Sequence, residues 1–151
     1  MNTPDRIKDI LGEQVKGYQA LLEVLQRERA CLVHLNPEGV ETLAKEKDTI
    51  MLKLRLLEDE RVRLVQAFSR ETGVTGDMTL QRIHQITGDA AYTRLRSQML
   101  SLVQSISELN EFNKILIERS SNFVRRTLGF LDSLGPSTDR KTAGSVLSRE
   151  V

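Results

Sequence analysis

Cys31 and His34 come closest, by residue type and spacing, to a pair that could do covalent chemistry. They are three residues apart, so on a helix they would share one face, where a thiolate can pair with an imidazole. Covalent catalysis also needs free N–H groups to hold an oxyanion, and the middle of a helix has none. The spacing therefore favours a structural interpretation, in which Cys31 is a small buried group near a helix end.

Metal-ligating residues are few and scattered. His34 and His84 are fifty residues apart, and neither has a Glu three positions earlier. Glu58, Asp59 and Glu60 are adjacent, so they fan around a helix and indicate a solvated face. One cysteine allows neither an intramolecular disulfide nor a zinc site with several thiolates. We expect no metal.

No glycine-rich phosphate loop stands out either. Gly73 and Gly76 lack the Lys-Ser/Thr sequence and the preceding strand that such a loop requires. With neither a nucleophile site nor a metal or cofactor site, the sequence predicts a protein that binds other proteins and is not an enzyme.

Composition points to one helical domain. The chain has 151 residues, 39% hydrophobic and 28% charged, with 4% aromatics and no Trp. Leu, Glu, Arg, Lys and Gln are abundant, which is typical of long helices. The net charge is +1, and acids and bases are interleaved throughout, so we expect no nucleic-acid interface.

We recognise neither a secretory signal nor a membrane-spanning segment in the sequence. The N-terminus, MNTPDRIKDI, carries two acids and no apolar core segment, and no apolar run approaches the ~20 residues that span a bilayer. We expect a cytoplasmic protein without membrane insertion.

Apolar spacing predicts three long helices. The first begins with Thr3 as N-cap, and its apolar line steps by three and four, with Arg29 in one slot. Asn36 and Pro37 start the second helix, and a connection this short joins antiparallel neighbours. Its seam has coiled-coil spacing and consists of Val40, Leu43, Lys47, Ile50, Leu54, Leu57, Arg61, Leu64 and Phe68.

Two charged residues interrupt that seam. Lys47 and Arg61 either pack their stems while their charges reach solvent, or they fix the register or pair a buried acid.

A loop at residues 73–77 and a short helix at 79–86 precede the last helix, which starts at the cap Asp89 and extends to Leu134. The predicted fold is all-α: an elongated antiparallel up-and-down helical bundle or coiled coil of three long helices with a short extra helix. Residues 1–134 form the helical domain. Residues 135–151 form a flexible tail.

The final helix is apolar over a wide arc from Lys114 to Leu134, directly after Asn113. Asn113, Ser120 and Thr127 occupy alternate seam slots there. Because this helix is longer than the other two, its end projects beyond them unless it closes on the first helix. An apolar overhang marks a binding surface or an oligomer interface. The candidate binding residues are Phe112, Leu116, Ile117, Phe123, Val124, Leu128, Phe130, Leu131 and Leu134.

Three stretches follow one another in a recognisable order: LLEVLQRERACL at 21–32, NPEGVETLAKEKDTIMLKLRLLEDERVRLV at 36–65, and LNEFNKILIERSSNFVRRTLGFL at 109–131. A Leu-Glu-x-x-Arg stretch begins at Leu57, and Asn113-Lys114 precedes the Ile-Leu-Ile of 115–117. The order of these elements, the length of the chain and the segment at 113–117 together resemble the FlgN family of flagellar type III export chaperones. The resemblance covers most of the chain.

The resemblance implies a cytoplasmic chaperone for the hook-associated proteins FlgK and FlgL. It would hold a terminal cargo segment in an unpolymerised state on the surface from Leu116 to Leu134, and deliver it to the export gate protein FlhA. One departure concerns gate docking. The family has a Tyr soon followed by Gly beyond the last helix, whereas this chain has Ser137 to Arg140, no Tyr, and Gly144 later.

Two other interpretations stay open. A coiled-coil adaptor or structural protein would use its heptads to oligomerise, and it predicts no unused apolar surface on the last helix. A chaperone for another flagellar cargo, such as flagellin or the filament cap, fits the sequence equally well. Monomer and homodimer are both compatible with the sequence.

Overall fold

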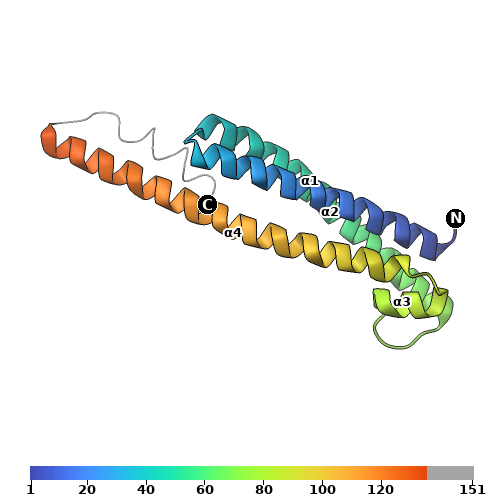
Figure 1. Cartoon of the computed structure of the whole chain (residues 1–151). Helices are drawn as coiled ribbons and strands as arrows, with labels where there is room; N and C mark the ends of the chain where they lie inside the picture. The colour runs from blue at the N-terminus through green and yellow to red at the C-terminus, as the bar shows by residue number, and fades with distance from the viewer. Residues whose placement is uncertain (136–151) are drawn as a thin grey trace. The chain divides into compact units, whose positions relative to one another are not determined.

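The computed structural model describes residues 1–135, and this part of the chain contains four α-helices and no strand (Figure 1). The helices are α1 (Thr3–Val33), α2 (Pro37–Thr72), α3 (Leu80–Thr87) and α4 (Ala91–Leu134). The prediction of an all-α chain with three long helices and a short one is confirmed. The predicted flexible tail lies outside the described residues from position 136 onward.

The start of α1 differs by one residue from the prediction. The Asn2 side-chain oxygen accepts a hydrogen bond from the backbone N–H of Asp5 at 2.9 Å, so Asn2 is the N-cap. The predicted cap, Thr3, instead donates its hydroxyl to the Glu71 carboxylate at 2.7 Å. Asn is at least as good an N-cap as Thr, and Thr3 has a charged partner on α2.

The remaining helix ends follow the predicted residues. Asn36 accepts from the backbone N–H of Gly39 at 3.0 Å and begins α2. Thr79 caps α3, and Gly88, with a left-handed φ of 74°, ends it. Asp89 accepts from the first amide of α4.

The chain forms two compact units. Unit 1 consists of Met1–Leu22 and Thr49–Ile106, and unit 2 consists of Glu23–Asp48 together with the chain from Ser107. Each of α1, α2 and α4 contributes a segment to both units. Each unit therefore buries the apolar residues of its own segments of these three helices.

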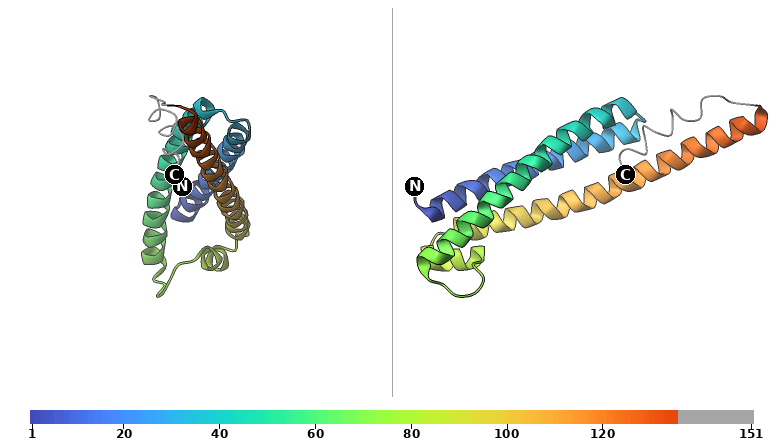
Figure 2. Two further views of the ribbon diagram at one scale, coloured as in Figure 1. Left: turned by 90° about the vertical axis from the view of Figure 1, so that its left-hand side faces the viewer. Right: turned by 180° about the vertical axis from the view of Figure 1, so that it is seen from behind.

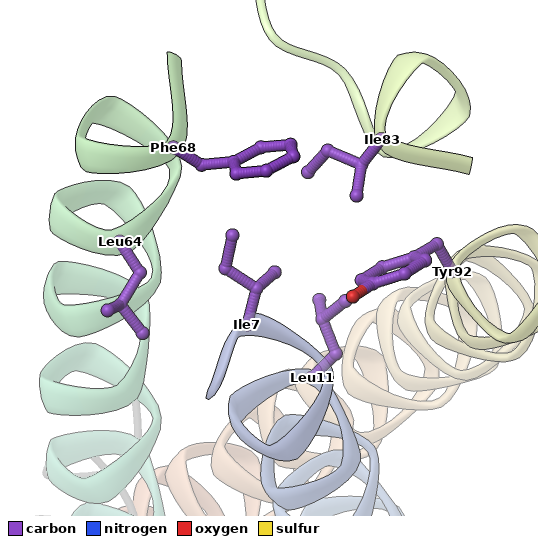
Figure 3. Packing of buried hydrophobic residues seen from close by; sticks show 6 residues of the cluster. All are labelled: Ile7, Leu11, Leu64, Phe68, Ile83 and Tyr92. Carbon is purple, nitrogen blue, oxygen red and sulfur yellow. The ribbon is translucent and has the colours of Figure 1, made fainter. Parts of the chain in front are cut away.

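Unit 1 has an apolar core that all four helices supply. Its buried residues are Ile7, Leu11, Leu64, Phe68, Ile83 and Tyr92. Figure 3 shows Phe68 of α2 directed at Ile83 of α3, with Ile7 of α1 close to both. The Tyr92 hydroxyl donates to the backbone carbonyl of Pro4 at 2.6 Å, so the one polar group of this cluster is satisfied. The short helix α3 therefore acts as a cover for this core.

A glycine allows α1 and α2 to pack closely in unit 1. A Cβ at Gly17 would lie 2.6 Å from Leu54 Cδ2, well inside van der Waals contact. Gly17 is buried, and Leu54 is a predicted seam residue that is also buried. The helix propensity lost at Gly17 is offset by this packing.

Unit 2 has a smaller core at the α1–α2 connection. Leu32 of α1, Val40 of α2 and Ile117 of α4 are buried together there. The α1 and α2 segments of this unit run antiparallel as a hairpin, and the α4 segment runs parallel to α1 (Figure 2). This is the predicted up-and-down order within the unit. One elongated bundle and one domain over residues 1–134 stay predictions.

The predicted seam of α2 is confirmed, because every one of its nine positions is buried or half-buried. The two charged positions both have acidic partners. Lys47 pairs with buried Glu28 at 2.8 Å, which matches the interpretation that it meets a buried acid. Half-buried Arg61 donates from Nε to Glu58 at 2.8 Å.

Candidate protein-binding surface

The nine candidate residues of α4 divide into three groups by exposure. Leu116, Val124 and Leu128 are half-buried, and Ile117 is buried. The other candidates are exposed, namely Phe112, Phe123, Phe130, Leu131 and Leu134. Most of the predicted surface is therefore accessible, but Ile117 belongs to the unit 2 core and Leu116 packs against it.

Helix geometry explains this division. Successive residues turn by about 100°, so residues three, four or seven apart share a face. An inner line through Ile117, Val124 and Leu128 continues the face that contacts the hairpin. An outer line through Phe112, Phe123 and Phe130 lies roughly 120° away, on a face that the hairpin does not cover.

The hairpin ends before α4 does. Ile117 packs at the α1–α2 connection, and it is the last buried residue on α4 within the described chain. From there to Leu134 the helix continues for about 25 Å at ~1.5 Å per residue. Phe123 is 64% exposed and Phe130 is 63% exposed. We call residues 118–134 the overhang.

A buried polar cluster holds α4 against the hairpin just before the overhang. Asn113 donates from Nδ2 to the Leu25 carbonyl and to Glu28 Oε1, each at 2.9 Å. Glu28 accepts from Lys47 through its second oxygen at 2.8 Å. Glu28 and Asn113 are each 1% exposed, so a charge and an amide replace apolar contacts in this layer.

Sequence reasoning found only part of this cluster. Asn113 was predicted as a polar seam slot, and Lys47 as a residue that pairs a buried acid in one of two interpretations. Glu28 was missed, because Arg29 was placed in the seam; Arg29 is exposed and Glu28 is buried. A Glu four residues before Leu32 on the same face was the available signal.

The predicted structural role of Cys31 agrees with its surroundings. Cys31 is half-buried against the small unit 2 core. A Cβ at Gly39 would lie 2.7 Å from its sulfur, so Gly39 makes room for it at the start of α2. His34 is exposed and lies one residue beyond the end of α1. Cys31 is therefore a packing residue, and His34 belongs to the turn after α1.

The acidic run of α2 does not converge on one point. Glu58 is half-buried and bonds to Arg61 and, at 2.8 Å, to the Gln14 amide. The Arg61 guanidinium holds the pKa of Glu58 below its ordinary value, burial acts in the opposite direction, and Gln14 lowers it further. Within residues 1–135, no group of three or more His, Cys, Asp or Glu side chains is arranged to hold a metal ion.

No helix among the described residues is both long enough and apolar enough to cross a membrane. Charged residues interrupt the exposed apolar residues of the overhang. Arg119, Arg125 and Arg126 lie between the phenylalanines. Such a mixture suits a protein partner better than a lipid interior.

Comparison with known proteins gives one result. A family model described as FlgN protein matches residues 1–138. Searches of curated proteins and of solved structures found no match. The match covers the four helices and nearly all of the chain, and the resemblance drawn from the three sequence stretches is confirmed. This chain belongs to the FlgN family of flagellar export chaperones.

Proposed function

We propose that this chaperone works in the cytoplasm and binds a terminal segment of FlgK-like and FlgL-like hook-associated proteins on the α4 overhang. The observation that supports the proposal is the exposure of large apolar side chains past Ile117. Phe123, Phe130 and Leu134 are each more than half exposed, on the part of α4 that extends past the hairpin.

The physical mechanism is the burial of one amphipathic helix against another. Apolar anchors at spacings of three and four residues fit a partner helix without nucleotide or metal. A cargo segment held in this way is not free to polymerise, which keeps it competent for export. The complex then meets an FlhA-like gate protein. Docking through a Tyr beyond α4 does not apply here, since the chain has none in that position.

Ile117 has a different role in this proposal. Because it packs with Leu32 and Val40, it anchors α4 to the hairpin and does not face the cargo. The cargo-contacting residues are then the exposed and half-buried candidates: Phe112, Leu116, Phe123, Val124, Leu128, Phe130, Leu131 and Leu134.

The adaptor interpretation fits these observations less well. A coiled-coil adaptor predicts no unused apolar surface on the last helix, whereas the α4 overhang exposes several apolar residues. A chaperone for another flagellar cargo would use the same surface, so the cargo is a question for the binding assay.

Two substitutions test the proposal. Phe123→Ala removes an anchor expected to contribute about 2 kcal/mol to binding. Val124→Asp places an unpaired charge against the apolar side of the cargo. Phe123→Ala should leave the urea midpoint nearly unchanged, because Phe123 is exposed and truncating such residues usually changes stability by less than ~1 kcal/mol. The midpoint of Val124→Asp is measured beside it, since Val124 is half-buried.

The assay measures capture of purified FlgK-like and FlgL-like proteins beside urea unfolding. Val103→Asp is the matched control, since Val103 is an exposed valine of α4 in unit 1. Lost capture with a retained midpoint, and normal capture by the control, support the proposal. A collapsed midpoint for Phe123→Ala, or full capture by well-folded Val124→Asp, contradicts the assignment of this surface.

A further inference from the structure

The outer line of α4 carries arginines as well as apolar residues. Steps of four, three, four, three and four residues connect the positions that share this face, which spans about 80° of the helix. In order they are Phe112, Leu116, Arg119, Phe123, Arg126 and Phe130. This is the spacing of a coiled-coil seam. Leu116 is half-buried against the unit 2 core, and the other five positions are exposed.

Neither arginine has a partner within the described chain. Arg119 and Arg126 are exposed, and neither takes part in a hydrogen bond or ion pair among residues 1–135. No acidic residue stands three or four positions from either one on α4, so the helix itself supplies no counter-charge. In contrast, Arg27 of the same unit pairs with Glu46 at 3.1 Å.

The arginines disfavour a second copy of this chain as the occupant. If two seams paired in parallel and in register, Arg119 would face Arg119 and Arg126 would face Arg126. If they paired antiparallel with full overlap, Arg119 would face Phe123 and Arg126 would face Leu116. The parallel arrangement brings like charges together in a partly desolvated seam, and the antiparallel one places each arginine against an apolar residue without a counter-charge. Both oppose association.

Resting on the proposed function, we infer that the outer seam selects a helical cargo segment with acidic residues at two positions of its own apolar seam, seven residues apart. Arg119 and Arg126 are separated by about 10 Å along the helix axis. Two carboxylates at that spacing would pair with both arginines while apolar residues meet the phenylalanines. The spacing is the same for a parallel and an antiparallel cargo helix.

The charges would act mainly on the choice of partner. The phenylalanines give affinity to any amphipathic helix of suitable spacing, whereas the arginines favour acidic seams and disfavour basic ones. Because the arginines are exposed before binding, salt should weaken the discrimination more than it weakens the apolar contact.

The experiment uses the full chain and two synthetic 25-residue helical peptides as probes. The peptides share one leucine seam and differ only at two seam positions seven apart, which are Glu in one and Lys in the other. Fluorescence anisotropy at low salt should show about tenfold tighter binding of the Glu peptide. The double variant Arg119→Glu/Arg126→Glu should prefer the Lys peptide instead.

The matched control is Lys114→Glu/Arg125→Glu. It changes the same number of charges on the same segment, but both residues lie on the opposite flank of the inner line. It should keep the preference for the Glu peptide. Equal binding of both peptides by the wild-type chain overturns the inference, and so does a reversal of preference by the control variant.

Other occupants give distinct results. A wild-type dimer in sedimentation that Phe123→Ala/Phe130→Ala separates would place a second copy on the seam and overturn the inference. Much tighter binding of both peptides after removal of residues 136–151 would place the chain's own tail there, with the same consequence. Capture of hook-associated proteins without peptide discrimination rejects only this inference, whereas discrimination without capture rejects only the proposed function.

Discussion

Unit 1 and unit 2 use segments of the same three helices, yet their α4 segments are covered differently. In unit 1, α3 covers the core, and six residues from four helices are buried in one cluster. In unit 2 three residues are buried at the α1–α2 connection, with Val24, Leu25 and Leu43 buried elsewhere in the unit, and α4 continues past the connection with its phenylalanines exposed. The difference is in what covers each α4 segment.

The two units also place their polar groups differently. Unit 1 keeps its ion pairs near solvent, as between Lys8 and Asp89 at 2.7 Å, and it satisfies the Tyr92 hydroxyl. It also buries the Gln14 amide, which donates to Glu58 while its Oε1 atom has no hydrogen-bond partner. Unit 2 buries Glu28 and Asn113, and the Asn113 Oδ1 atom has no hydrogen-bond partner. The difference is that unit 2 buries a carboxylate, Glu28, whereas the fully buried polar side chain of unit 1, Gln14, is a neutral amide.

The largest effect is expected in the unit 1 core. Leu11→Ala removes a fully buried side chain and should lower the free energy of unfolding by about 3–5 kcal/mol. Leu131→Ala is the matched control, since Leu131 is an exposed leucine of the overhang and its truncation should cost less than ~1 kcal/mol. Urea unfolding measures both, and equal losses would remove the contrast between the units.

The buried pair of unit 2 should give an intermediate effect. Lys47→Met leaves the Glu28 carboxylate buried without its cation and should destabilise the protein by about 2–3 kcal/mol, because Lys47 is itself partly exposed. Glu28→Gln/Lys47→Met removes both charges and should recover most of that loss. A double variant as unstable as Lys47→Met alone would show that the charge of Glu28 is not the cause.

The smallest effect concerns acid. Arg61 holds the pKa of Glu58 below its ordinary 4.5, and Lys8 lowers the pKa of Asp89. A carboxylate whose pKa is lower in the folded state stabilises the fold above its ordinary pKa, and this contribution is lost as the pH falls through the folded pKa. Acid should therefore weaken unit 1 through these two groups.

Glu58→Gln isolates one of these contributions. Between pH 7 and pH 3 this variant should lose less stability than the wild-type chain, by a small margin because the Glu58 side chain is 46% exposed. Urea midpoints at several pH values give the comparison. Glu118→Gln, which removes an exposed carboxylate of the overhang, should follow the wild-type curve. Parallel curves for wild type and Glu58→Gln would contradict the account of the Arg61 pair.

The sequence predicted the α2 seam and most helix ends because both depend on local signals. Apolar spacing identifies the buried face. Asn36 and Thr79 cap helices through side-chain oxygens that accept nearby backbone N–H groups, and Gly88 ends α3 through its left-handed backbone. The prediction failed where a tertiary contact determines which residue is buried. Glu28 and Arg29 are adjacent charged residues, and only the positions of Lys47 and Asn113 determine which one is buried.

The candidate surface shows the same limit. The apolar arc of α4 was readable from residue types, but the inner and outer lines are both apolar in sequence. Only the position of the α1–α2 connection shows that Ile117 is core and that Phe123 is free. The same holds for Gly17, because helix propensity does not reveal its close contact with Leu54.

The most direct test of the division between the units is hydrogen–deuterium exchange on the free chaperone and on its complex with a hook-associated protein. In the free protein, amides of residues 118–134 should exchange much faster than those around Leu11 and Leu64, because no neighbouring helix supports the overhang. Cargo should protect residues 118–134 and leave the unit 1 core unchanged. Protection gained in unit 1, or none gained on the overhang, would contradict the assignment of cargo binding to α4.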